Sequence, residues 1–368
     1  MKRILLIGTH PNQNTGYASV MHNMIQRLSQ KNTVIVFGFQ ASSNPTPEYN
    51  SNVIVQSFQD FGLQNINALI KLSNPDTIII YNDPCVVCNF IVTMRQIEHS
   101  AKTIAYLDLV YPFVKKSHID TLNENCDVVC TFLETWKTEL ESNGITRPIH
   151  VVTHGLDSDI VCIDKESARK QLNIVHDGPL LLNMNKNVPR KRYDVFFKGL
   201  SRYYTDNPDS CLRVVVGTFR NGAWDLEEMI ERLYPNLNDK IEFLKEPHNM
   251  SKKTVNLLYN ACEYGINTCD GEGFGLCNYE HAAVGGRQIL TDLKVFREIY
   301  DDNATYIDVS CEYHADNMRD SIGGIASIAD YKDLSKKLEE ILSNQETKLP
   351  FELKYEYDKE IEKLEALC

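Results

Sequence analysis

Short, continuous apolar runs recur along the chain and alternate with amphipathic stretches. The runs are rich in β-branched residues and lack the polar–apolar alternation of a half-exposed strand. They cover residues 4–8, 33–39, 76–81, 103–107, 128–130 and 149–152, and then 180–184, 212–217, 241–244, 264–267 and 288–291. Strands buried on both faces are typical of parallel sheets covered by helices. The sequence therefore predicts an α/β fold with doubly wound parallel sheets.

The stretches between these runs have helical periodicity. In the first helix, predicted over residues 16–30, Val20, Met24 and Leu28 share one face. Further helices are predicted over residues 165–173, 192–205, 225–234, 251–262, 275–285, 330–342 and 351–367. Strand and helix thus alternate in two successive sets.

The pattern breaks around residues 153–159, where Gly155 lies close to Asp157 and Asp159. We place the domain boundary here, because glycine and clustered aspartates mark turns. The 368 residues divide into an N-terminal domain, 1–155, and a C-terminal domain, 156–347. After Pro350, the segment 348–368 is either a solvated cap or a helix that crosses back onto the first domain. Of these two, we predict the helix that crosses back onto the first domain.

The bulk composition limits the partners and the location. A net charge of −12 argues against binding nucleic acid through phosphate neutralisation. No apolar run approaches the roughly 18 residues of a membrane helix, so no transmembrane segment is predicted, and peripheral membrane contact stays open. The apolar run after Met1-Lys2-Arg3 is too short for a signal peptide and indicates a buried strand. We expect a cytoplasmic protein.

The chain contains 11 cysteines. Without a secretion signal they are expected to be free thiols, most of them small buried hydrophobic residues. The alternative is a zinc site built from two pairs, Cys85 with Cys88 and Cys126 with Cys130, although no histidine has finger-like spacing.

Residues 270–280 form the most informative segment. Gly271, Gly273 and Gly275 follow a predicted strand and precede a predicted helix. Backbone without side chains lets amide groups approach an anion, and the helix N-terminus favours negative charge. Glu272 and Glu280 on one helix would be about 12 Å apart, too far for the paired carboxylates of a retaining hydrolase, which need about 5–5.5 Å. They suit the two ends of an elongated ligand, unless the segment is a tight turn with solvated glutamates.

Glu272-Gly273-Phe274-Gly275-Leu276 followed by Glu280 resembles the donor-site motif of the GT-B retaining glycosyltransferases of glycosyltransferase family 4. Three other stretches resemble the family's junction turn, its basic loop and its later Ala-to-Asp and Glu-Ile patterns: residues 154–157, 185–192, and 283–292 with 297–299. The resemblance covers residues 150–345 closely and the first half loosely. It implies a GT-B fold, with two Rossmann-like domains facing a central cleft.

The resemblance also implies roles for residues. Glu280 would bind the donor ribose and Glu272 the sugar hydroxyls, while Lys186 and Lys191 would neutralise the diphosphate. The backbone of the glycine-rich segment would cradle the phosphates, so the donor-binding set includes Gly273, Phe274, Gly275 and Leu276. Lys186 replaces a family arginine and lacks its planar fork, which Arg190 or Arg192 is placed to supply. A solvated basic face is the alternative for residues 186–192.

Two candidates lie in the first half. Gly16, after Asn14 and Thr15, resembles the family's glycine loop that meets the phosphates, and simple helix capping is the alternative. Asp108 stands near the position where the family carries a histidine, and it would orient an acceptor hydroxyl or accept its proton. A structural aspartate at a strand end is the competing interpretation.

These observations predict a retaining glycosyltransferase, a hexosyltransferase. It would move a hexose from a nucleotide-sugar of the GDP-mannose or UDP-glucose type to a hydroxyl of a glycan, lipid or protein-linked acceptor. The catalytic set is Glu272, Lys191, Lys186 and Asp108. No metal or other cofactor is expected, because fixed cations meet the leaving-group charge. The alternatives are an epimerase or phosphorylase on the same fold, and a non-catalytic nucleotide-sugar binding protein.

Overall fold

The computed structural model describes residues 1–112, 114–247, 250–315, 324–343 and 351–368. The chain divides into two compact units. Unit 1 contains Met1–Gly155 and Tyr355–Cys368, and unit 2 contains Leu156–Ala315 and the described residues from Ile325 to Lys354. Each unit is built around its own parallel sheet.

The sheet of unit 1 has seven strands in the order β3-β2-β1-β4-β5-β6-β7. All neighbouring strands are parallel, and β1 lies between β2 and β4 at its centre. The strands are β1 (Arg3–Thr9), β2 (Thr33–Phe39), β3 (Val53–Ser57), β4 (Thr77–Asn82), β5 (Lys102–Leu107), β6 (Val128–Thr131) and β7 (Ile149–Val151). The progression of strands reverses between β1 and β4, which makes this a doubly wound sheet.

Unit 2 repeats the plan with six parallel strands in the order β10-β9-β8-β11-β12-β13. They are β8 (Leu180–Asn183), β9 (Arg213–Val216), β10 (Ile241–Phe243), β11 (Tyr264–Asn267), β12 (Arg287–Thr291) and β13 (Ala304–Ile307). Here the progression reverses between β8 and β11. A separate two-stranded sheet, β14 (Val309–Ala315) and β15 (Gly324–Ala329), completes the unit.

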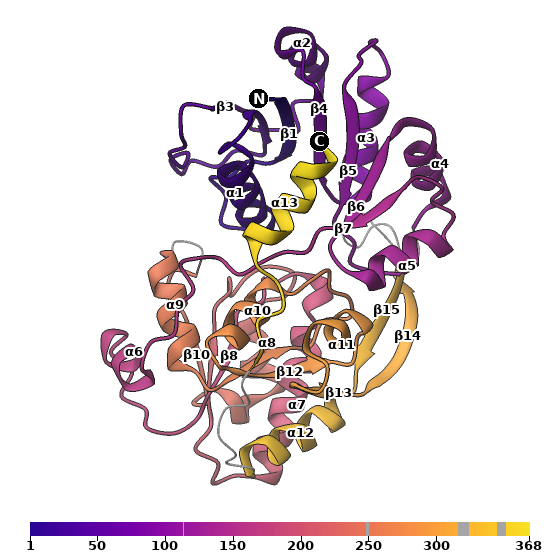
Figure 1. Ribbon diagram of the computed structural model, residues 1–368. Helices are drawn as coiled ribbons and strands as arrows, with labels where there is room; N and C mark the ends of the chain where they lie inside the picture. Colours follow the sequence, from indigo (N-terminus) through magenta and orange to yellow (C-terminus); the bar gives the residue numbers. More distant parts are fainter. Residues whose placement is uncertain (113, 248–249, 316–323, 344–350) are drawn as a thin grey trace. The chain divides into compact units, whose positions relative to one another are not determined.

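Helices connect the strands in both units (Figure 1). Unit 1 has α1 (Gly16–Leu28), α2 (Leu63–Ser73), α3 (Pro84–Met94), α4 (Lys116–Asn125), α5 (Glu134–Ser142) and α13 (Tyr357–Leu367). Unit 2 has α6 (Lys165–Gln171), α7 (Tyr193–Asp206), α8 (Leu226–Leu233), α9 (Lys252–Ala261), α10 (Leu276–Ala283), α11 (Lys294–Tyr300) and α12 (Tyr331–Ser343), with 3-10 turns at Pro189–Lys191 and Pro235–Leu237. The predicted α/β class with doubly wound sheets is confirmed.

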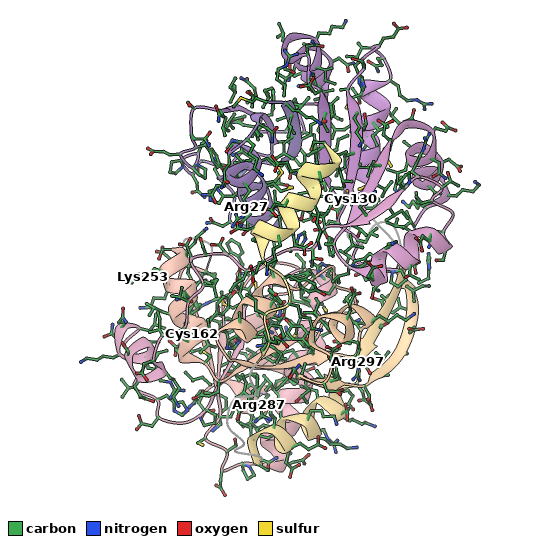
Figure 2. The ribbon with its side chains drawn as sticks, viewed as in Figure 1. Arg27, Cys130, Cys162, Lys253, Arg287 and Arg297 are labelled. Atoms are coloured by element: carbon green, nitrogen blue, oxygen red, sulfur yellow. The ribbon has the colours of Figure 1, made fainter. Side chains whose placement is uncertain are left out.

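The last helix, α13, packs on α1 within unit 1. Figure 2 labels Arg27 on α1 beside α13, and its Nε donates to Asp358 Oδ1 at 2.6 Å. Glu360 accepts a hydrogen bond from the Thr153 backbone at 2.9 Å. At Gly155 a Cβ atom would lie 2.1 Å from the Tyr357 nitrogen. The glycine therefore permits the close passage of the terminal segment.

The predicted start of the terminal helix is wrong. The helix begins at Tyr357, six residues after the predicted start at Phe351. The Phe351 ring packs edge-on against Tyr279 at 5.6 Å and lies 5.4 Å from the Tyr300 ring. Periodicity alone placed Phe351 in the helix, whereas this aromatic contact keeps it with unit 2. Pro350 lies outside the described residues.

Candidate active site

The glycine-rich segment connects β11 to α10 at the carboxyl edge of the unit 2 sheet. Gly275 is the N-cap of α10 with φ 80°, a left-handed conformation that favours glycine. A Cβ atom there would lie 2.9 Å from Phe296 Cε1. Residues 184–192, which follow β8, lie at the same edge, because β8 and β11 are parallel neighbours. Both segments flank the reversal point, where doubly wound sheets bind ligands.

The Glu272 carboxylate is buried, with 5% of the residue exposed, and it is surrounded by donors. Arg190 Nη1 donates to its Oε1 at 3.0 Å, and Lys191 Nζ donates to Oε2. Asn267, the last residue of β11, donates to Oε2 at 2.9 Å. Burial by itself would raise the Glu272 pKa, but the two cations and these hydrogen bonds outweigh it and lower the pKa to about 2. Glu272 is therefore an anion at neutral pH.

Hydrogen bonds to backbone carbonyls join the two loops that supply these groups. The Asp270 amide donates to the Arg190 carbonyl at 2.8 Å, and Arg190 Nη1 also donates to the Gly271 carbonyl at 3.3 Å. Asn185 Nδ2 donates to the Ile266 carbonyl at 3.0 Å. The cations and the carboxylate consequently belong to one preorganised assembly.

The N-terminus of α10 lies next to this assembly in sequence. Within the residues that the structure describes, no hydrogen-bond acceptor is found for the backbone amides of Gly275, Leu276 and Cys277. The first turn of this eight-residue helix carries no acidic side chain. Unsatisfied amides and the helix dipole make such an end attractive to an anion.

The remaining predicted residues of unit 2 differ in burial. Lys186 is exposed, and among the described residues no partner for its ammonium group is found. The Phe274 ring is buried and packs edge-on against Tyr279 at 5.1 Å, and the Gly273 amide donates to Glu272 Oε1 at 3.3 Å. Arg192 pairs with Asp194 at 2.5 Å and lies 3.7 Å from Asp270. Arg190, rather than Arg192, contacts Glu272.

Glu280 lies on α10 in a different environment. Its Oε2 accepts a hydrogen bond from the Tyr259 hydroxyl at 2.8 Å. Burial raises the Glu280 pKa; the Tyr259 hydrogen bond opposes this, the Asp157 charge adds to it, and the Lys252 charge opposes it. The result is a pKa of about 7. Glu272 precedes the helix that carries Glu280, so the two do not share one helix as the spacing estimate assumed.

The two candidates in unit 1 lie at the carboxyl edge of its own sheet. Gly16 is the exposed first residue of α1, and Thr15 caps this helix by accepting from the Ala18 amide at 3.2 Å. Asp108 directly follows β5 and accepts a hydrogen bond from the Tyr81 hydroxyl at 3.0 Å.

Sequence reasoning missed several residues that complete the site. Asn267 had a usable signal, since it is a polar residue that ends an apolar strand. Tyr259 and Lys252 had none, because they lie on a neighbouring helix 21 and 28 residues before Glu280.

The cysteines are free thiols. Burial raises the pKa of both Cys88 and Cys126 to about 12, so both stay protonated, as small apolar side chains do. In the described ranges, no group of three or more His, Cys, Asp or Glu side chains is arranged to hold a metal ion. Nor does the described part of the chain contain a helix with the length and apolarity to span a membrane.

Comparison with solved structures shows similar folds. Sucrose-phosphate synthase from Thermosynechococcus elongatus has a TM-score of 0.73 at 14% identity, with 99% of this chain and 95% of that one covered. Anabaena HepE in complex with UDP-glucose has a TM-score of 0.66 at 12% identity, with both chains fully covered. At such low identity these similarities establish the fold, a GT-B-like pair of Rossmann-like sheets.

Comparison at the sequence level is more specific. The chain is 24% identical over 230 residues to the serotype-specific mannosyltransferase WbdA of Escherichia coli, covering 60% of this chain and 27% of that protein. The chain thus spans about a quarter of this relative's length. The family described as "Glycosyl transferases group 1" matches residues 164–356, just over half of the chain. That match includes both site loops, and the chain belongs to the glycosyl transferases group 1 family.

Proposed function

We propose that the chain transfers a hexose from a nucleotide-sugar to a hydroxyl of an acceptor, with retention of the anomeric configuration. One observation carries the proposal: a buried carboxylate holds Arg190 and Lys191 beside a helix N-terminus with unsatisfied amides. Cations and amides at one place suit the diphosphate of such a donor.

In this proposal each group has a separate task. Lys186, Lys191 and the amides of Gly275 and Leu276 bind the diphosphate, and Arg190 assists them. Glu272 accepts hydrogen bonds from hydroxyls of the sugar, and Glu280 accepts them from the ribose. The leaving nucleoside diphosphate gains negative charge as the glycosidic bond breaks, so fixed positive groups lower the barrier.

The ionisation of Glu272 limits the mechanism. With a pKa of about 2, this carboxylate has no proton to donate to a leaving group at neutral pH. Departure then depends on charge stabilisation, as it does for a phosphate leaving group. In the retaining reaction the departing phosphate oxygen takes the acceptor proton during front-face attack, with Asp108 orienting the acceptor hydroxyl.

The donor is proposed to be of the GDP-mannose or UDP-glucose type. A mannosyltransferase among the relatives favours the first, and a similarly folded protein in complex with UDP-glucose favours the second. The acceptor is proposed to be a glycan, a lipid or a protein-linked hydroxyl.

A thermal-shift screen against UDP-, GDP- and ADP-sugars tests the proposal first. A bound donor increases the free energy of unfolding by mass action, by about 2.7 kcal/mol at a hundredfold excess over Kd, and so raises the thermal midpoint. The stabilising donor is then incubated with candidate acceptors, with and without EDTA, and the anomeric configuration of the product is read by NMR. Transfer with retention that persists in EDTA is expected. Release of an epimerised sugar or a sugar phosphate would replace the proposal with another reaction.

A further inference from the structure

The side chain of Glu280 is held from one direction by α9. The Tyr259 hydroxyl donates to Glu280 Oε2 at 2.8 Å, and the Tyr259 ring is buried and stacked on the His281 ring, with centroids 5.5 Å apart. The position of the hydroxyl is therefore fixed by packing. One lone pair of Oε2 accepts the hydrogen bond from Tyr259, so Oε1 and the second lone pair of Oε2 do not point at this hydroxyl.

The same helix supplies a charge to this region. Lys252, the first residue of α9, pairs with Asp157 at 2.9 Å and with Asp159 at 3.0 Å. Lys252 and Tyr259 are seven residues apart, which places them on the same face of the helix. Only 8% of the Asp157 side chain is exposed, so its charge acts on its surroundings with little screening.

We propose that Tyr259 is a positioning residue, which holds Glu280 toward the vicinal hydroxyls of a nucleoside diphosphate, and that the neighbouring Lys252–Asp157 ion pair influences the charge of Glu280. The inference rests on the proposed function, in which Glu280 binds the donor ribose.

Whether Glu280 is ionised decides how well it can bind the two hydroxyls of the ribose. An ionised carboxylate accepts hydrogen bonds from two adjacent hydroxyls, whereas a protonated one loses acceptor capacity. The groups that act on Glu280 are Tyr259 and Lys252 on α9 and Asp157 in the junction segment, and Glu280 in turn raises the pKa of the Cys277 thiol on α10. Burial and Asp157 raise the Glu280 pKa, while Tyr259 and Lys252 lower it, giving about 7. Binding through the diol is consequently present above pH 7 and lost as the pH falls through it.

The test measures the affinity of the full chain for UDP and GDP by calorimetry between pH 5.5 and 9, and repeats it with the 2′,3′-dideoxy analogues. The ratio of the two Kd values at each pH isolates the diol, because titration of the phosphate cancels. In the wild type we expect the dideoxy analogue to bind about tenfold more weakly at pH 8, one charge-assisted hydrogen bond contributing about 1.5 kcal/mol. The ratio should approach one near pH 5.5.

Two variants should raise the pH midpoint of this ratio, and a third should lower it. Tyr259→Phe and Lys252→Ala remove groups that lower the Glu280 pKa, so the midpoint shifts to higher pH and high pH restores the wild-type ratio. Asp157→Asn removes a negative charge, so the midpoint shifts to lower pH. Tyr204→Phe is the matched control, since Tyr204 lies on α7 and its hydroxyl donates to the Leu212 carbonyl at 2.9 Å rather than to Glu280.

The possible outcomes distinguish a failure of this inference from a failure of the proposed function. Midpoints that shift in the two directions stated support the inference, because loss of structure would weaken binding at every pH. A ratio that is independent of pH, or variants that share the wild-type midpoint, would overturn the inference while the donor site stands. A wild type that binds neither nucleotide at any pH overturns the proposed function as well.

Discussion

Glu272, in the glycine-rich segment, and Glu280, on the helix α10 that follows it, have opposite electrostatic surroundings. Glu272 lies between Lys191, Arg190 and the Asn267 amide, and its pKa is lowered to about 2. Among the described residues Glu280 has one hydrogen-bond partner, a neutral phenol, and its pKa is raised to about 7. Burial opposes ionisation in both. Neighbouring charges and hydrogen bonds, rather than the extent of burial, therefore decide which of the two carboxylates stays ionised at neutral pH.

The difference also separates their proposed tasks. A permanently ionised carboxylate holds two cations at fixed positions, which preorganises a diphosphate site. A carboxylate that titrates near neutrality responds to small changes around it, as functional groups at binding sites often do. Substitutions at and around the two residues test this contrast.

Removal of the Lys191 charge should have the largest effect. Lys191→Met keeps the apolar stem and leaves Glu272 with Arg190 as its one cation partner. Loss of a group that stabilises developing charge is expected to lower kcat about 100- to 1000-fold. Loss of one partner of a buried pair should also lower the free energy of unfolding by about 3 kcal/mol. Transfer assays and urea denaturation measure the two effects.

Lys336→Met provides the control, because Lys336 is an exposed residue on α12. It should change neither quantity. An unaltered kcat in Lys191→Met would show that this cation has no part in the reaction.

Neutralising Glu272 should lower the free energy of unfolding, whereas neutralising Glu280 should not. At pH 8, Glu272→Gln leaves Lys191 and Arg190 without their anion and should lower the free energy of unfolding by about 2–3 kcal/mol. Glu280→Gln removes a charge that burial opposes, and its amide oxygen still accepts from Tyr259. This variant should be as stable as the wild type or more stable by about 1 kcal/mol. Parallel urea titrations decide the question, and equal losses in both variants would contradict the contrast.

Much of the fold could be predicted from the sequence. Buried parallel strands have a distinctive apolar composition, so the predicted strands are all present, with β2 and β11 at the predicted bounds. Four strands were missed: β3, β14 and the short β13 and β15, in which small or polar residues interrupt the larger apolar ones. β3 carries alternating, largely exposed side chains, and most of β14 is exposed. None of the four has the long, continuous apolar run on which the strand predictions were based.

The sequence predicted which segments form the site, but not the contacts between those segments. The glycine spacing and the apolar strand before it placed the motif at the carboxyl edge of a sheet, and the basic loop was recognisable as a cluster. Sequence spacing could not show that Lys191 and Arg190 pair with Glu272, because those contacts join loops about 80 residues apart. The contribution of Tyr259 arises from the packing of α9 against α10, which no local pattern records.

The pH dependence of stability should differ between the two glutamates. For Glu272, the folded-state pKa lies below the ordinary value of 4.5, so its stabilising contribution is present above pH 4.5 and is lost as the pH falls through about 2. For Glu280 the folded-state pKa is raised, so its contribution is present below pH 4.5 and is lost as the pH rises through about 7.

Urea denaturation from pH 4.5 to 8 isolates the second contribution. The stability of the wild type relative to Glu280→Gln should fall by about 3 kcal/mol across this window, since the folded-state pKa of about 7 lies well above the ordinary value of 4.5. Relative to Glu272→Gln it should stay nearly constant over the same range, because Glu272 has finished titrating. A flat difference for Glu280→Gln would be evidence for an ordinary carboxyl pKa at this position.

The smallest expected effect comes from Tyr313, on β14. Its hydroxyl donates to Asp270 Oδ2 at 2.7 Å, and the Ser327 amide of β15 donates to the Asp270 carbonyl at 2.8 Å. The two-stranded sheet thus contacts the residue that begins the motif, on the Glu272 side of the contrast. Tyr313→Phe should lower the free energy of unfolding by about 1 kcal/mol and reduce kcat a few-fold, without moving the pH midpoint of ribose-dependent nucleotide binding. A shifted midpoint would mean that the two glutamates are coupled, and their separation into two independent charge sites would then have to be abandoned.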